Sequence, residues 1–323
     1  MTDGPVEAGV PGPATLSAAP LRASGPGGNI YDLGYQGYDG PRLGRGAAFR
    51  ALFWHTVRSC YGIGRGGRAK IAPLVLGAIA LLPAIIAVGI AALAKQAGQF
   101  GEVVEQSSPI NYASYFSIVS TFVILFCAIQ APELLGRDQR HGVLPLYFSR
   151  ALARHDYAVA KVLGLGASLL VLILLPYIVL FVGRILVADN PIDGLGKELP
   201  SLGPLLAQGT LTAGLLGALS MAISAFTPRR AYATVGIIAA IIIPTIVAAL
   251  LAEEVLGSAG RAIVLLSPGD VLDGANAALF GSSPDSPILR EARLPGVAYI
   301  ASAVIGILVA VGLTIRRYLR IAA

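Results

Sequence analysis

The chain has 323 residues, of which 55% are hydrophobic and 13% are charged, and its formal net charge is +6 at pH 7. Soluble domains contain about 25% charged residues, so the sequence lacks the polar side chains that would cover a globule of this length in water. The composition excludes an ordinary soluble domain and predicts an all-α integral membrane protein.

The first 46 residues are predicted to form a largely disordered tail. Residues 1–28 consist mainly of Pro, Gly and Ala with scattered Ser, a composition that buries no core. A signal peptide would need a basic start and then a short apolar run, and we recognise neither. The distribution of charge described below places this tail in the cytoplasm.

Residues 47–70 are predicted to form an amphipathic helix at the membrane surface, followed by a basic linker. The stretch AAFRALFWHTVRSCYG begins at residue 47 and places apolar side chains on one helical face, with arginines beside it and a tryptophan suited to the membrane–water boundary. The residues expected at the interface are Phe49, Leu52, Phe53, Trp54 and Val57. The alternative is an ordinary helix packed against the bundle.

Six stretches are apolar over the roughly 20 residues that a membrane-crossing helix needs. None of them carries a charged side chain, and the prolines within them are tolerated in membrane helices. They make residues 71–323 a six-span transmembrane domain. The predicted spans are residues 71–94, 112–131, 162–183, 204–226, 231–252 and 296–315.

The distribution of Lys and Arg predicts the orientation of these spans. If both termini lie inside, 18 of the 24 Lys and Arg residues fall on the inner side and 6 on the outer side. Cytoplasmic connections carry such an excess, so we expect a plasma-membrane protein with both termini in the cytoplasm. This orientation in the lipid bilayer explains the basic charge without a nucleic-acid partner.

Two connections on the expected outer side differ in length. Residues 186–203 read as a loop rich in Pro, Gly and Asp. Residues 253–295 form a longer outer loop with two apolar segments, Ile263–Leu266 and Val271–Leu279, which are too short to span a bilayer. We expect short helices at the outer leaflet before the last span, and the alternative is a lid-like loop packed over the bundle.

The sequence offers no recognisable catalytic, cofactor-binding or metal-binding residues. Gly194 to Lys197 is the segment nearest to a phosphate-binding loop, and it lacks the hydroxyl residue that the motif requires. The three histidines lack metal-ligand spacing. We interpret Cys60 and Cys127 as packing thiols. The absence of a carboxylate within the predicted spans counts against a carrier driven by an ion gradient.

The segment from Pro132 to Lys161 is highly charged, although the spans on either side carry no charge. It reads PELLGRDQRHGVLPLYFSRALARHDYAVAK. Pro145 suits the first turn of a helix, after which apolar and basic side chains fall on different faces. The apolar face comprises Leu144, Phe148, Ala151 and Leu152, and the basic face comprises Arg150 and Arg154. A short amphipathic helix attached to two spans is suited to carry a partner's motion into the bundle.

This segment resembles the cytosolic loop between the second and third spans of permease subunits in the type-2 export family of ABC transporters. The resemblance rests on Arg137-Asp138-Gln139-Arg140, Gly142-Val143-Leu144, Leu146-Tyr147-Phe148, Ser149-Arg150, Arg154, Tyr157 and Lys161. Val143 replaces a threonine, and Ala151 a proline, that are common in that family. The resemblance covers residues 47–323, and Ile30–Gly46 resembles the leader of actinobacterial members.

The resemblance implies that the chain is not an enzyme, because a separate ATPase subunit binds ATP and Mg²⁺ and hydrolyses ATP. It also implies a second permease chain, identical or not, and export as the usual direction of transport. The charged loop would be the coupling helix, with ATPase contacts at Glu133, Arg137, Asp138, Arg140, Leu144, Leu146, Phe148 and Arg150. The alternatives are a secondary carrier or channel driven by an ion gradient, a membrane-embedded enzyme and a non-transporting partner subunit.

Overall fold

The computed structural model describes residues 40–41, 43–96, 111–149, 152–254, 262–284 and 286–320. The chain divides into two units, and the second, Leu43–Ala323, contains all the helices discussed below. Within the described residues all regular secondary structure is helical, which confirms the predicted all-α class. Most of the tail, including most of Ile30–Gly46, lies outside the described residues, so its disorder stays a prediction.

Six helical stretches are long and apolar enough to cross a membrane, as predicted. The third of these helices in chain order has 34 residues, which is more than a bilayer requires. In chain order they are α2 (Arg68–Gln96), α4 (Tyr112–Arg140), α6 (Arg154–Val187), α8 (Leu202–Phe226), α9 (Arg230–Glu254) and α13 (Gly296–Leu319).

Helices α4 and α6 extend beyond their apolar runs. α4 continues to Arg140 and α6 already begins at Arg154, because the backbone hydrogen bonds of a helix do not require apolar side chains. Residues 141–153 therefore form the whole connection, which contains the five-residue helix α5 (Leu144–Phe148). The predicted amphipathic helix is thus shorter than expected, and Arg150 and Ala151 lie outside the described residues.

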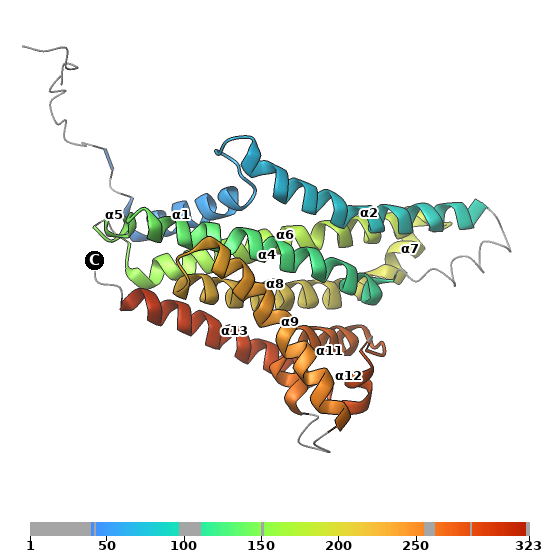
Figure 1. Ribbon diagram of the computed structural model, residues 1–323. Helices are drawn as coiled ribbons and strands as arrows, with labels where there is room; N and C mark the ends of the chain where they lie inside the picture. Colours follow the sequence, from blue (N-terminus) through green and yellow to red (C-terminus); the bar gives the residue numbers. More distant parts are fainter. Residues whose placement is uncertain are drawn as a thin grey trace, which may run out of the picture. The chain divides into compact units, whose positions relative to one another are not determined.

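Helix α8 lies at the centre of the bundle. It packs against α4, α6 and α13, and its apolar stretch is the most buried of the six. Small residues allow this close packing: a methyl group added at Gly217 would lie 3.1 Å from the side chain of Leu169 on α6. α2, α9 and α13 instead leave broad apolar faces exposed, as helices in contact with lipid do. The side-by-side course of α4, α6 and α8 is visible in Figure 1.

The predicted amphipathic segment forms α1 (Gly44–Cys60), which packs mainly against α6. Its buried face follows helical spacing and consists of Leu52, Thr56, Ser59 and Cys60. Phe49, Phe53 and Val57 are half-buried, and Trp54 is exposed. The alternative of a helix packed on the bundle thus describes one face of α1, while its contact with the membrane stays a prediction.

The prediction of a loop between α6 and α8 is wrong, because α7 (Pro191–Glu198) and a 3-10 turn, η1 (Leu199–Ser201), fill it. Asn190 caps α7 by accepting a hydrogen bond from the backbone N–H of Ile192, and Pro191 occupies the first turn. A polar helix of two turns leaves little periodicity in the sequence, and the Pro and Gly residues obscure it further.

The predicted short helices before the last span are present as α11 (Pro268–Phe280) and α12 (Pro287–Ala292), preceded by the 3-10 turn η2 (Val264–Leu266). α11 packs against α4, α8, α9 and α13. Its buried polar residues include Asp270 and Asn276, and Asn276 donates a hydrogen bond to the backbone oxygen of Ala113 on α4. α11 is therefore an integral part of the bundle.

Candidate functional site

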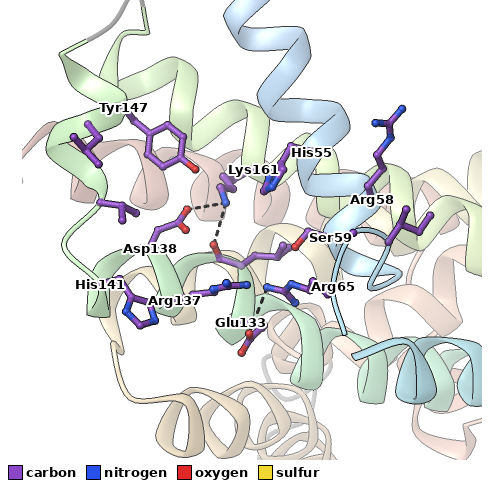
Figure 2. Close-up of a pocket in the computed structure, with 15 residues that line it drawn as sticks. His55, Arg58, Ser59, Arg65, Glu133, Arg137, Asp138, His141, Tyr147 and Lys161 are labelled. Atoms are coloured by element: carbon purple, nitrogen blue, oxygen red, sulfur yellow. Dashed lines mark hydrogen bonds and ion pairs between the residues drawn. The ribbon is translucent and has the colours of Figure 1, made fainter. Parts of the chain in front are cut away.

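A hollow of about 820 Å³ lies where α1, α4, α5 and α6 meet (Figure 2). One wall of the hollow consists of α1 and the turn after it, and a second wall is the polar end of α4. Residues of the connection between α4 and α6, around α5, form the third wall. The lining residues that carry or can carry charge are His55, Arg58, Arg65, Glu133, Arg137, Asp138, His141 and Lys161. Much of the charged loop singled out in the sequence thus borders this hollow.

An ion pair between α6 and α4 lies at the inner wall of the hollow. Lys161 Nζ is 2.8 Å from Asp138 Oδ2 and donates a hydrogen bond to the backbone oxygen of Leu134 at 3.1 Å. The hydroxyl of Tyr157 donates a second hydrogen bond to Asp138 Oδ2 at 2.7 Å. Lys161 is 3% exposed, so its charge depends on these contacts rather than on water.

The ring of Tyr157 joins α5 to the bundle. Its centroid lies 5.4 Å from that of Tyr147 and 5.9 Å from that of Phe148, both on α5. On the other side it lies 5.1 Å from the ring of Tyr318 on α13. Gln139 Nε2 donates hydrogen bonds to the Tyr318 hydroxyl and to the backbone oxygen of Ala225 at the end of α8. These contacts connect α5 with α4, α6, α8 and α13.

Glu133 joins two other elements. Its carboxylate lies 3.4 Å from Arg65, in the turn before α2, and 3.5 Å from Arg230, at the start of α9. Each pair is partly exposed to solvent and is therefore weak individually, but one carboxylate fixes the positions of three chain segments. Two predicted ATPase contacts, Glu133 and Asp138, thus form internal ion pairs.

The remaining predicted contacts divide by exposure. Leu146 is 68% exposed, whereas Leu144 is 7% exposed and packs into the core. Phe148 is half-buried against Tyr157 and is therefore held inside. Two arginines of the set, Arg137 and Arg140, are exposed at the end of α4.

The hollow carries excess positive charge. The side chains of Arg58 and Arg137 form no ion pair or hydrogen bond with any of the described residues, whereas those of Arg65 and Lys161 each pair with a carboxylate. Burial lowers the pKa of His55, and the positive charge of Lys161 lowers it further. The site is thus suited to attract an anion.

Both cysteines of the chain are buried. Burial raises the pKa of the Cys60 thiol to about 11, which keeps it protonated and unreactive. Cys127 is also a buried free thiol. Across the part of the chain that the structure describes, no three His, Cys, Asp or Glu side chains are placed to hold a metal ion.

Sequence reasoning missed the contributions of α1, α8 and α13 to this site. His55, Arg58 and Arg65 were assigned to a surface helix and a linker, and Tyr318 had no role. One signal was available: Lys161 stands directly before an apolar span, and a cation at that depth needs a partner. The identity of that partner could not be read from the sequence, because it depends on how α4 and α6 pack.

Six helices long and apolar enough to cross a membrane define the architecture of a multi-pass membrane protein. Residues 70–321 match the family described as ABC-2 family transporter protein, and the chain belongs to this family. A search of curated proteins finds no match for the chain. Family membership makes the chain the multi-pass membrane component of an ABC exporter that associates with a separate ATPase, where ATP is bound and hydrolysed. It confirms the resemblance to the type-2 export family, and the likeness of Ile30–Gly46 to an actinobacterial leader stays a prediction.

Proposed function

We propose that α5 and the adjacent end of α4 receive the movement of the ATPase subunit on the cytoplasmic side of the plasma membrane. Both termini lie on that side, since 18 of the 24 Lys and Arg residues fall there in this orientation. The predicted contact residues are retained with one refinement. Leu146, Arg137 and Arg140 touch the ATPase. The other residues hold the contact surface in place, namely Glu133, Asp138, Leu144 and Phe148. Arg150 lies outside the described residues.

The exposure of Leu146 carries this proposal. Leu146 is 68% exposed on a five-residue helix, whereas Leu144 on the same helix is buried and Tyr147 and Phe148 are half-buried. An apolar anchor beside exposed arginines is the composition typical of protein interfaces. A push on α5 would reach α6 through Tyr157. It would reach α8 and α13 through Gln139 and Tyr318.

Two further features complete the proposal. α1 lies along the cytoplasmic leaflet, with Arg50, Trp54 and Arg58 on its exposed face and Leu52 and Thr56 turned toward α6. Two permease chains, identical or different, form the path together. The central position of the tightly packed α8 supports this, because a cargo needs room that the middle of one bundle does not offer.

The experiment co-expresses the chain with its ATPase subunit and compares Leu146→Asp with Ile192→Asp. Ile192 is an exposed apolar residue on α7, at the opposite end of α6, and serves as the matched control. We expect Leu146→Asp to reduce co-purification of the ATPase at least tenfold with an unchanged melting temperature of the permease. Equal co-purification of both variants would contradict the assignment of α5 as the contact.

A further inference from the structure

We propose that the hollow between α1, α4 and α5 binds the phosphate group of an anionic phospholipid from the cytoplasmic leaflet. The inference relies on the cytoplasmic placement of this end of the bundle proposed above. It goes beyond the ATPase contact, because it assigns a ligand to the permease chain itself.

The charges in the hollow point to a phosphate. Arg65 and Lys161 are matched by Glu133 and Asp138, whereas Arg58 and Arg137 have no partner among the described side chains. Guanidinium groups bind phosphate oxygens through paired hydrogen bonds. Basic pockets between transmembrane helices on the cytoplasmic side bind lipid head groups.

The exposed face of the neighbouring helix favours a lipid over a soluble anion. Ile63 lines the hollow and is exposed, and the turn that contains it leads directly into α2. Ile71 and Leu74, in the first turns of α2, are exposed as well. Acyl chains can lie along this apolar face while the phosphate occupies the hollow. A soluble phosphate would use only the charges and leave this surface uncovered.

The dimensions of the hollow agree with a head group. Its volume of about 820 Å³ falls within the roughly 300–1,000 Å³ of small-molecule sites. Its wall combines the basic residues with Val143 and Leu146, so the polar region is bordered by apolar side chains. A phospholipid has the same division between a charged phosphate and apolar chains.

The test uses the full chain in detergent micelles and follows the fluorescence of Trp54. The chain has one tryptophan, and it lies on α1 beside His55. Phosphatidylglycerol, phosphatidylcholine and inorganic phosphate are titrated separately. We expect saturable binding of phosphatidylglycerol, at least tenfold tighter than that of phosphatidylcholine, and no response to millimolar phosphate.

Two variants assign the binding to the hollow. Arg58→Gln removes an unpaired cation that lines it, and we expect phosphatidylglycerol to bind about fivefold more weakly. Arg50→Gln is the matched control, because Arg50 is exposed on the same helix and does not line the hollow. Its affinity should stay within twofold of the unchanged chain. If Arg58→Gln fails to fold, Arg137→Gln tests the same hollow from α4.

Three outcomes would overturn the proposal. Equal affinities for the two lipids would show that charge is not recognised, and equal effects of Arg58→Gln and Arg50→Gln would remove the hollow as the site. Binding of inorganic phosphate as tight as that of phosphatidylglycerol would replace the lipid by a soluble anion. Since no ATPase is present, a failure here leaves the Leu146 experiment unaffected, and the two proposals fail separately.

Discussion

The pair formed by Lys161 and Asp138 shows how a single residue governs the junction. Lys161→Met removes the cation and leaves the Asp138 carboxylate with the hydroxyl of Tyr157. Breaking a buried ion pair costs about 3 kcal/mol or more, because one charge is left uncompensated. We expect the free energy of unfolding in detergent to fall by about this amount.

A double variant separates charge from packing at this pair. Adding Asp138→Asn to Lys161→Met removes the unpaired carboxylate and should restore at least half of the lost stability. Arg140→Met is the control, because Arg140 is exposed on the same junction and its removal should cost less than about 0.5 kcal/mol. A loss below about 1 kcal/mol for Lys161→Met would mean that the pair contributes little.

Asp270 on α11 gives the protein a dependence on pH. The residue is buried, Oδ2 has no hydrogen-bond partner among the described atoms, and burial raises the pKa of the carboxyl above its usual value of 3.8. The folded state therefore holds this proton more tightly than the unfolded state does. The resulting contribution to stability is complete below pH 3.8 and is lost as the pH rises through the folded-state pKa.

Asp270→Asn should remove this dependence and raise the melting temperature at pH 7, since a neutral amide avoids the burial of a charge. Thermal unfolding between pH 5 and pH 8 measures the effect. Asp273→Asn is the control, because the Asp273 carboxylate is only partly buried and accepts a hydrogen bond from the backbone of Ser286. A lower melting temperature of Asp270→Asn at pH 7 would indicate that the native state needs the carboxylate.

The surroundings of individual charged residues could not be predicted from the sequence. The predicted spans contain no carboxylate, yet Asp270 is buried, because α11 folds into the bundle from a connection that looked peripheral. The contact of Asp138 with the ATPase stays a prediction, and its ion pair with Lys161 was not foreseen. A charged residue looks the same in a sequence whether it meets water, a partner or a buried counter-ion.

At the scale of elements, the contact between α1 and α6 depends on a glycine. A methyl group at Gly164 would lie 2.6 Å from the side chain of Thr56, whereas one at Gly166 would meet nothing within 4 Å. Gly164→Ala should therefore push α1 away from α6. Gly166→Ala, on the same helix, should be neutral or stabilising by up to about 1 kcal/mol, since alanine favours helices.

Limited proteolysis after Arg58 measures this separation. Arg58 lies on α1, so cleavage should become several times faster in Gly164→Ala and stay unchanged in Gly166→Ala. Equal cleavage of the two variants would mean that α1 and α6 adjust without loss of contact.

The elements themselves were largely predictable. Runs of about 20 apolar residues impose helices in a bilayer, so all six spans follow from hydropathy. The extensions of α4 to Arg140 and of α6 from Arg154 did not follow, because charged residues there resemble a loop. The packed face of α1 was also obscured, since Thr56 and Ser59 are polar and yet buried.

At the scale of the whole molecule, Gln139 on α4 connects the junction with two other helices. Its side-chain amide donates hydrogen bonds to the hydroxyl of Tyr318 on α13 and to the backbone oxygen of Ala225 at the end of α8. Which helices this side chain would bridge could not be predicted, because the sequence does not fix the order in which six apolar helices pack.

Gln139→Leu should separate binding of the ATPase from the transmission of its movement. The variant keeps Leu146 exposed, so the ATPase should still co-purify, in contrast with Leu146→Asp. It loses two hydrogen bonds worth about 1 kcal/mol each, and we expect ATP turnover of the complex in nanodiscs to change severalfold. Thr210→Val is the control, because that hydroxyl is exposed and bonds within α8. Normal turnover of Gln139→Leu would show that the movement passes through the ring contacts of Tyr157 and not through Gln139. Loss of the ATPase would place Gln139 in the contact itself.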